Sequence, residues 1–467
     1  MSERIPAKII DAAATRRTPA DAGGPIHTKA FSGRYRLFRI LGAGSLFALF
    51  FGTVWLTWNQ RQAVLWDLVN RKFHIFGATF WPQDLILLSA ILIIAAFGLF
   101  FITVAAGRIW CGYTCPQSVW TWVFMWAEKV TEGDRHQRVR LDAAPWSANK
   151  ILRRGGKHAI WLGVSLLTAL TFVGYFTPIR ELTTGLLTLD LGSQAAFWVF
   201  FFTAATYINA GWLREKVCRD MCPYARFQSV MFDRDTLVIS YDAARGEQRG
   251  PRRKDSDPAA QGLGDCIDCT LCVQVCPTGI DIRDGLQFEC IGCAACIDAC
   301  DSVMDKMGYA RGLVSYTSES ALEGGKTQWL RPRLVGYAGV LTLMIGLFVV
   351  ALVERPLMSI DVTRDRNLFR ENSAGQVENV YRLKVINKRQ QPGSYQISLD
   401  APDGFRLVSP DLLHLGAEDI LDLPVNVIWE GEQWPEPRKE INFVLSAVDF
   451  VSNDVVADST FLAPVRR

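Results

Sequence analysis

The sequence predicts a multi-domain membrane protein. An α-helical transmembrane bundle of about five spans carries a two-cluster, ferredoxin-like domain and a C-terminal, all-β, immunoglobulin-like sandwich. Three observations predict this fold class. Five stretches are apolar over about 20 residues, the length that crosses a bilayer. Eight cysteines repeat a short spacing twice between residues 266 and 300. Beyond residue 353 the hydrophobic pattern alternates from residue to residue, which is typical of strands.

The predicted membrane domain covers residues 34–240 and follows a polar stretch, residues 1–33, whose Ala, Pro and Gly content predicts a disordered tail. The apolar stretches are Leu37–Trp58, Leu85–Ala106, Ala159–Phe176, Ala195–Leu213 and Leu334–Val353. The third is the shortest, and a buried soluble helix is the alternative interpretation of it. Trp161 and Tyr175 favour a span, because such aromatic residues anchor helices at the membrane interface. The fifth span, residues 334–353, stands apart from the other four.

Basic residues predict the side of the membrane on which each loop lies. They precede the first span and are frequent between the second and third spans and between the fourth and fifth, whereas Arg180 is the only basic residue in 177–194. The positive-inside rule therefore predicts a multi-pass membrane protein. Its N-terminus and cysteine-rich block would lie in the cytoplasm and its C-terminal domain on the outer side. Arg61, Arg71 and Lys72 oppose this topology, because they lie on the predicted outer side.

The eight clustered cysteines follow the spacing C-x2-C-x2-C-x3-C twice, which is the bacterial signature for two iron–sulfur clusters. Three cysteines at short intervals hold one cluster, and the fourth holds the other. We therefore predict two [4Fe–4S] clusters in a domain at residues 264–310, on Cys266, Cys269, Cys272 and Cys300, and on Cys290, Cys293, Cys296 and Cys276. A pair of zinc ribbons is the alternative, but zinc needs only four ligands per ion and leaves the later spacings unexplained. Asp301 stands where a proline is usual.

The remaining four cysteines form two C-x3-C-P motifs, each directly after a pair of spans. The motifs contain Cys111 and Cys115 with Pro116, and Cys218 and Cys222 with Pro223. Since proline is favoured at the first position of a helix, the second cysteine of each motif is expected at a helix start. This internal repeat could bring four thiols to one site, and soft sulfur ligands select Cu(I). Two unremarkable buried cysteine pairs are the alternative interpretation.

Other functions find little support in the sequence. The cytoplasm keeps thiols reduced, so we expect these cysteines to bind metals or to act in redox chemistry rather than to form disulfides. No histidine lies in the middle of a span, where it could hold a haem, and no G-x-G-x-x-G motif follows a strand. The net charge of +3 gives no reason to expect nucleic-acid binding. Residues 241–263 have the composition of a linker, whose basic run at 252–254 could contact membrane lipid.

After the last span, residues 360–467 alternate between apolar and polar side chains, with turn residues between the segments. The predicted strands are Val380–Ile386, Ser394–Leu399, Phe405–Val408, Ile420–Val427, Ile441–Ala447 and Asp458–Leu462. Short strands at this spacing predict an immunoglobulin-like sandwich. The domain contains no cysteine, one histidine (His414) and one methionine near its start (Met358). We therefore expect a docking or structural module.

With its paired spans, both C-x3-C-P motifs, the doubled ferredoxin spacing and the β-rich tail, the chain resembles the FixG/RdxA/CcoG family of cbb3-type cytochrome c oxidase accessory proteins. The resemblance covers nearly the whole chain. It implies a role in assembling this oxidase, in which Cu(II) is reduced to Cu(I) before copper enters the binuclear centre. The resulting hypothesis makes Cys111, Cys115, Cys218 and Cys222 the copper-reducing site. Its partners would be copper ions, a cytoplasmic electron donor, assembly factors, copper chaperones and a second copy of the chain.

Two alternatives stay open. The membrane half also resembles NapH and NosR-like proteins, which share the C-x3-C-P pairs and the clusters but are linked to quinol oxidation. The chain could also be a non-enzymatic assembly scaffold whose clusters are structural. The C-terminal sandwich favours the oxidase-assembly family.

Overall fold

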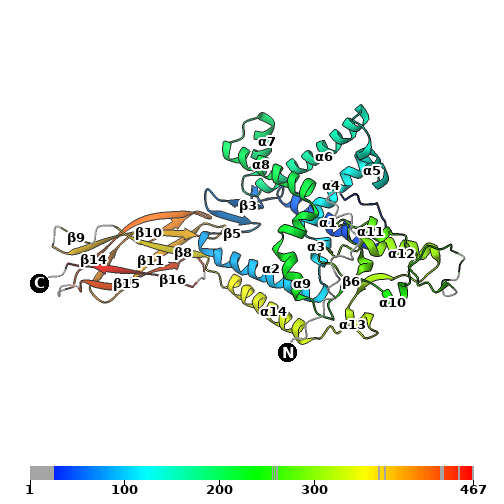
Figure 1. The fold of residues 1–467 in the computed structure, drawn as a ribbon. Helices are drawn as coiled ribbons and strands as arrows, with labels where there is room; N and C mark the ends of the chain where they lie inside the picture. Colours follow the sequence, from blue (N-terminus) through cyan, green and yellow to red (C-terminus); the bar gives the residue numbers. More distant parts are fainter. Residues whose placement is uncertain are drawn as a thin grey trace. The chain divides into compact units, whose positions relative to one another are not determined.

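The computed structural model describes residues 26–254, 256, 258, 261–365, 369–372, 375–431, 436–450 and 453–464. The chain folds into two compact units, whose elements are labelled in Figure 1. The first unit contains Met1–Leu56 and Ser89–Gly346, and the second contains Thr57–Leu88 and Leu347–Arg467. The second unit therefore includes a segment between the first two spans, which the sequence pattern did not predict.

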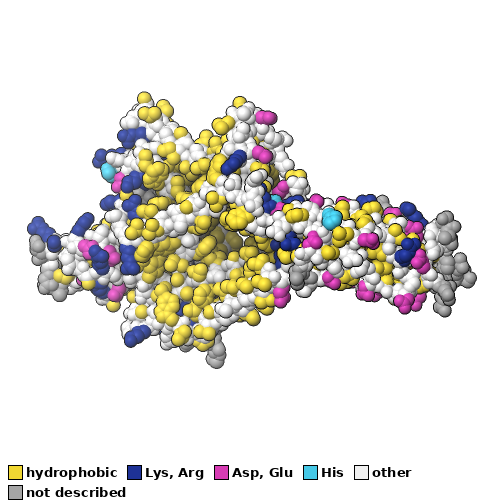
Figure 2. Space-filling model, turned by 180° about the vertical axis from the view of Figure 1, so that it is seen from behind, with side chains coloured by type: hydrophobic (Ala, Val, Ile, Leu, Met, Phe, Trp, Pro, Cys, Tyr) yellow, Lys and Arg dark blue, Asp and Glu magenta, His cyan; other side chains and the backbone are white. Residues whose placement is uncertain are grey.

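Within the part of the chain that the structure describes, five helices are long and apolar enough to cross a membrane, in agreement with the predicted number of spans. They are α1 (Arg34–Thr53), α2 (Leu85–Ala106), α6 (Ala148–Val173), α8 (Ser193–Tyr207), which continues as the π-helix η2 (Ile208–Leu213), and α14 (Pro332–Val353). Leu92 of α2 and Leu343 of α14 are 62% and 63% exposed. Figure 2 shows apolar side chains gathered over the helical part of the protein. Such an extended apolar surface is typical of a membrane protein.

Two spans differ from the predicted ones at one end. α1 ends at Thr53 instead of Trp58, because Thr57 and Trp58 form strand β1 (Thr57–Trp58). α6 begins at Ala148 instead of Ala159, so the shortest predicted span becomes a helix of 26 residues. Its first turns are polar, and Lys157 forms an ion pair with Glu132 (2.8 Å). Hydropathy alone could not locate this start.

Shorter helices complete the helical part of the first unit. They are α3 (Ile109–Tyr113), α4 (Pro116–Glu132), α5 (Arg135–Ala143), α7 (Ile179–Thr188), the π-helix η3 (Val217–Met221) and α9 (Pro223–Met231). α4 packs against α6, where the rings of Phe124 and Trp161 stack with centroids 5.2 Å apart. Glu128 of α4 binds both Arg138 (2.8 Å) and Arg214. These contacts fix α4, the helix that follows the first C-x3-C-P motif, against α5, α6 and the segment before the second motif.

The cysteine-rich part of the first unit is larger than the predicted domain at 264–310. Its ends are joined by an antiparallel pair of strands, β6 (Val238–Tyr241) and β7 (Val314–Thr317). Between them lie α10 (Ala243–Gly246), α11 (Leu271–Gln274), the 3-10 helix η5 (Ile282–Asp284) and α12 (Ala295–Met307), and α13 (Glu319–Leu322) follows. The first residues of the predicted linker 241–263 belong to this fold, since Arg245 forms an ion pair with Asp265 (2.5 Å).

The predicted disordered tail, residues 1–33, is wrong for its last residues. The backbone N–H of Lys29 donates to the carbonyl of Gln274 (2.8 Å), and Arg138 donates to the carbonyl of Thr28. These hydrogen bonds order an extended segment of polar composition, which its sequence alone could not indicate. Residues 1–25 lie outside the described residues.

The C-terminal part of the second unit is the predicted sandwich of two antiparallel sheets. One sheet has the order β12 (Phe405–Val408), β14 (Ile420–Trp429), β10 (Val377–Asn387) and β8 (Met358–Arg364), with β9 (Arg370–Glu371) beside β10. The other has the order β13 (Leu413–Leu415), β11 (Gly393–Asp400), β15 (Arg438–Ala447) and β16 (Val455–Leu462). The core lies between the sheets, where Tyr381 and Phe443 are fully buried. All six predicted strands are present. The prediction missed β8, β9 and β13, of which β9 and β13 are too short to show an alternating pattern.

The segment between the first two spans adds two small sheets to this unit. It contains β1, β2 (Arg61–Gln62), β3 (Val64–Asp67), β4 (Lys72–Ile75), β5 (Ala78–Phe80) and the 3-10 helix η1 (Pro82–Asp84). Arg61 forms an ion pair with Glu418 (2.6 Å), and Lys72 donates to the carbonyl of Glu418 (2.8 Å). Two of the three basic residues that oppose the charge rule therefore have partners in the C-terminal part of the same unit.

Replacing Asp84 with asparagine is expected to destabilise the second unit. The Asp84 carboxylate binds Arg355 (2.6 Å) and Lys388 (3.2 Å); Lys388 is buried with it, and the side chain of Arg355 is 11% exposed. Removing the charge leaves a buried and a largely buried cation without an anion, which costs about 3–5 kcal/mol. Thermal unfolding of the purified protein measures the effect. Asp422→Asn, on the exposed face of β14, is the matched control and should shift the midpoint little. Equal midpoints for the two variants would contradict the role of Asp84.

Candidate functional site

Two cavities in the cysteine-rich part are each lined by four of the eight clustered cysteines. The first is lined by Cys266, Cys269, Cys272 and Cys300. The second is lined by Cys276, Cys290, Cys293 and Cys296, and Cys272 reaches its edge. The structure thus brings together the two sets of cysteines that the spacing assigned to two clusters, including the exchange of Cys276 and Cys300 between the two halves.

Left-handed backbone conformations bend the chain around both cavities. In the first half, Asp268 has φ +51° and Thr270 has φ +56°. In the second half, Gly292 has φ +66° and Ala294 has φ +57°, at the equivalent positions of the repeat. Residues other than glycine rarely adopt positive φ, and such strain is concentrated at functional sites. α11 and α12 begin directly after these turns, so both halves present their thiols in the same way.

The donor set fits clusters better than single ions. A zinc ion needs four ligands around one point. A [4Fe–4S] cluster takes one thiolate on each of its four irons, so its ligands must surround a cavity, as the cysteines do here. Burial raises the pKa of the Cys272, Cys290 and Cys300 thiols to about 12. Buried thiols of this kind lose their protons when a metal centre binds them.

Both C-x3-C-P motifs have the same local structure at their second cysteine. Cys115 precedes α4, in which Pro116 is the first residue, and Cys222 precedes α9, in which Pro223 is the first residue. The ψ angles of the two cysteines are 126° and 113°, which are extended values. The prediction that both prolines open helices is confirmed. The first cysteines differ, since Cys111 lies in α3 and Cys218 lies in the π-helix η3.

The four thiols of these motifs lie near one another, and we call them the thiol quartet. Burial, together with the neighbouring thiols of Cys115, Cys111 and Cys222, raises the pKa of Cys218 to about 12. Burial also raises the pKa of Cys111 to about 11, with a further contribution from Cys115. The side chain of Gln228 on α9 lies 3.7 Å from the Cys111 sulfur and is fully buried. The helix after the second motif thus contacts the first motif.

The thiol quartet lies beside the second cysteine cavity. Cys111 and Cys218 pack into the same apolar cluster as Cys293, which lines that cavity. Gly112 lies so close to the loop that a Cβ atom built on it would be 2.4 Å from the carbonyl oxygen of Gly292. No side chain separates α3 from the loop at this point, so the two sites are in direct contact.

Arg108 stabilises the contact between α3 and the loop of the second cavity. Its guanidinium donates to the carbonyls of Phe288, Cys290 (3.1 Å) and Ala225 (2.7 Å), and the residue is buried. It therefore joins α3, the loop of the second cavity and α9. Sequence reasoning missed Arg108, Gly112 and Gln228 as functional residues. The adjacency of Arg108 and Gly112 to Cys111 was the only available signal, because their partners lie more than 100 residues away in the chain.

Comparisons with known proteins agree with this organisation. The family model for a 4Fe-4S dicluster domain matches residues 213–319, which include the second C-x3-C-P motif and all eight clustered cysteines. The family model for an Ig-like fold at the C-terminus of FixG matches residues 348–464, which form most of the second unit.

Whole-chain relatives are also found. The nitrogen fixation protein FixG of Rhizobium meliloti is 38% identical over 436 residues, covering 85% of this chain and 83% of that protein. Protein RdxA of Cereibacter sphaeroides is 39% identical over 398 residues, covering 82% of this chain and 83% of that protein. A crystal structure of a FixG-related protein from Vibrio parahaemolyticus is 26% identical and covers 23% of this chain and 98% of that chain, with a TM-score of 0.22.

Proposed function

The chain belongs to the FixG and RdxA family of membrane iron–sulfur proteins, and from this premise we propose that it reduces Cu(II) to Cu(I) during assembly of a cbb3-type cytochrome c oxidase. One observation carries the proposal. Cys111 and Cys218 of the thiol quartet pack against the apolar cluster of buried residues that contains Cys293, a proposed cluster ligand. The proposed electron source and the proposed copper site are therefore neighbours.

Eight residues would hold the two [4Fe–4S] clusters. Cys266, Cys269, Cys272 and Cys300 would hold the first, and Cys276, Cys290, Cys293 and Cys296 the second. When bound, the clusters supply electrons one at a time. The surrounding residues exclude water, since Ala294, Ile282 and Val275 are almost fully buried. Arg108 would place a cation beside the second site and so stabilise its negatively charged thiolates.

Copper is the substrate in this proposal. Cu(II) that reaches Cys111, Cys115, Cys218 and Cys222 gains one electron and becomes Cu(I), and the thiols lose protons as they bind it. Thiolates hold Cu(I) better than harder ligands do, so the product stays bound until an acceptor with similar soft ligands removes it. Copper chaperones and oxidase assembly factors are the acceptors that this chemistry fits.

Iron analysis tests the assignment of the ligands. Anaerobically purified protein should contain about eight irons per chain, four for each cluster. Cys269→Ala should remove about four of them, because Cys269 lines only the first cavity. Cys269 is exposed, so the fold should tolerate the change, and electron paramagnetic resonance should still detect the second cluster. Zinc in place of iron would contradict the proposal.

The proposed topology places the N-terminus and the cysteine-rich part in the cytoplasm and the sandwich in the periplasm of a bacterial inner membrane. It is supported by the fold of the second unit, which joins the segment between the first two spans to the part after the fifth. Two segments separated by four spans lie on the same side of a membrane. Reporter fusions after Leu263 and after Arg467 should report opposite sides. The same side for both would overturn the topology.

A further inference from the structure

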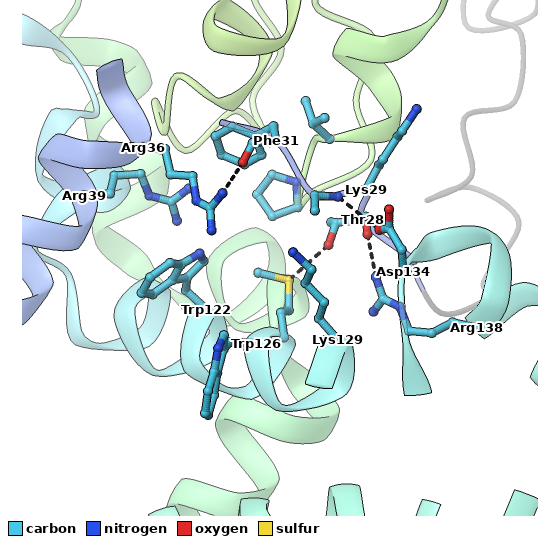
Figure 3. Close-up of a pocket in the computed structure, with 14 residues that line it drawn as sticks. Thr28, Lys29, Phe31, Arg36, Arg39, Trp122, Trp126, Lys129, Asp134 and Arg138 are labelled. Atoms are coloured by element: carbon cyan, nitrogen blue, oxygen red, sulfur yellow. Dashed lines mark hydrogen bonds between the residues drawn. The ribbon is translucent and has the colours of Figure 1, made fainter. Parts of the chain in front are cut away.

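A pocket in the first unit is lined by none of the twelve cysteines, and we call it the basic pocket. Its residues Phe31 and Val275 belong to the apolar cluster that also contains Cys111, Cys218 and Cys293. Its walls are the extended segment 28–31, the first turns of α1, one face of α4, and the loop after α11 that contains Val275 and Pro277 (Figure 3). It is open to the surroundings on one side and encloses roughly 620 Å³ of empty space, part of it open. Because α1 is a predicted span, its first turns mark the level of the membrane surface.

Three cations converge on this pocket. Figure 3 shows the side chains of Arg36 and Arg39 from α1 and Lys129 from α4 directed into it. Arg39 is only 7% exposed, and the described part of the chain offers its guanidinium neither a hydrogen bond nor an ion pair. A buried charge is costly unless it is paired. Arg39 thus holds a largely buried position in which its guanidinium can bind an anion that enters the pocket, and Arg36 lines the same pocket.

The acidic residue of the pocket wall does not fill this role. Asp134 accepts hydrogen bonds from the backbone N–H groups of Arg135 (2.8 Å) and Ala30 (3.2 Å), and so caps α5. The nearby Arg138 is paired with Glu128 (2.8 Å). Arg36 uses one nitrogen on the carbonyl of Phe31, which leaves the rest of its guanidinium to a ligand.

The other side of the pocket is largely apolar. Trp122, Met125 and Trp126 lie on the same face of α4 as the cation Lys129, and all four line the pocket. Trp126 is 52% exposed. Indole rings are enriched at the membrane interface, where an apolar body meets polar headgroups. An occupant of this pocket would therefore be anionic at one end and would continue into an apolar region.

We propose that the basic pocket binds the phosphate of an anionic phospholipid headgroup. Guanidinium groups match phosphate oxygens in a forked, charge-assisted geometry, and basic pockets beside membrane helices bind such headgroups. The bound phosphate would pair with Arg39 and Arg36, and Lys129 would contact it at the rim. It would join α1 and α4 to the loop that carries Pro277, and so would stabilise the attachment of the cysteine-rich part to the membrane helices.

Thermal unfolding of the full-length, cluster-containing protein in detergent tests this proposal. Phosphatidylglycerol is titrated into the micelles, with phosphatidylcholine and inorganic phosphate as parallel arms. We expect phosphatidylglycerol alone to raise the unfolding midpoint, with saturation. Arg39→Gln and Lys129→Gln should lose this rise. Arg34→Gln is the matched control, since Arg34 lies on the same helix, is exposed and does not line the pocket, and it should keep the rise.

An equal rise with phosphatidylcholine, or an equal loss in Arg34→Gln, would show that no specific anion site exists. An equal rise with inorganic phosphate would show that the pocket binds soluble phosphate rather than lipid. If Arg39→Gln fails to fold, the Lys129→Gln variant takes its place in the test, because Lys129 is exposed. A full rise of the unfolding midpoint with phosphatidylglycerol in Lys129→Gln would overturn the proposal.

Discussion

Replacing Cys111 and Cys115 with serine is expected to abolish Cu(II) reduction and to leave the iron content at about eight per chain. Both thiols belong to the quartet, whereas the eight proposed cluster ligands line two other cavities. Serine oxygen is a hard ligand and holds Cu(I) poorly. Replacing Cys218 and Cys222 should have the same effect. Replacing all four should add little, because residues that act as one site are not additive.

Iron content and Cu(I) formation, followed with a Cu(I)-specific chelator, are the two measurements. The results also separate the three functions that the sequence left open. Lost copper reduction with intact clusters supports the reductase. Unchanged copper reduction with lost quinol oxidation would support the NapH-like alternative. Normal oxidase assembly in the variant that lacks all four cysteines would leave only the scaffold.

Replacing Gly112 with alanine is expected to slow electron transfer to copper without removing either metal site. The added Cβ would lie 2.4 Å from the Gly292 carbonyl oxygen and 2.9 Å from the Cys293 Cα. Both are backbone atoms and cannot rotate away, so α3 and the loop of the second cavity must move apart. Overpacking of this kind costs about 1–3 kcal/mol. Stopped-flow reoxidation of the reduced clusters by Cu(II) measures the rate.

Gly98→Ala is the matched control for this variant. Gly98 lies in α2, where an added Cβ meets no atom within 4 Å. Since alanine is the better helix former by about 1 kcal/mol, Gly98→Ala should leave stability and rate unchanged or slightly improve stability. If Gly112→Ala transfers electrons as fast as Gly98→Ala, the contact between α3 and the cluster loop is not part of the electron path.

The sequence predicted those features that depend on residues close together in the chain. The cysteine spacing predicted which four cysteines line each cavity. Three ligands of each cluster lie close together in the sequence, and the fourth comes from the other half of the repeat. The prolines after Cys115 and Cys222 predicted two helix starts, because proline fixes its own φ angle. Five apolar stretches predicted five membrane helices, because length and hydropathy are properties of a single continuous stretch of chain.

Features that depend on distant residues could not be predicted. Arg108 reaches the carbonyl of Cys290, 182 positions away, and only the folded chain brings them together. The small strands β3, β4 and β5 have three or four residues each, which is too short for a reliable alternation. Arg61 of β2 and Lys72 of β4 opposed the predicted topology, and the sequence could not show that both contact Glu418 in the C-terminal part of the same unit. Segment 26–33 has the composition of a tail and is ordered by its hydrogen bonds to other segments.

The most direct test of the account is to mix anaerobic, prereduced protein with Cu(II) and to follow cluster absorbance, Cu(I) and free thiols together. Thiols can also reduce Cu(II) by forming disulfides, so the thiol count separates the two electron sources. With the Cu(I)-specific chelator present to remove the product from the thiol quartet, we predict that Cu(I) forms at the rate at which the clusters are reoxidised, to about two Cu(I) per chain, one for each cluster, with the thiol count unchanged. Clusters that stay reduced while Cu(I) forms and thiols disappear would contradict electron transfer from the clusters to copper.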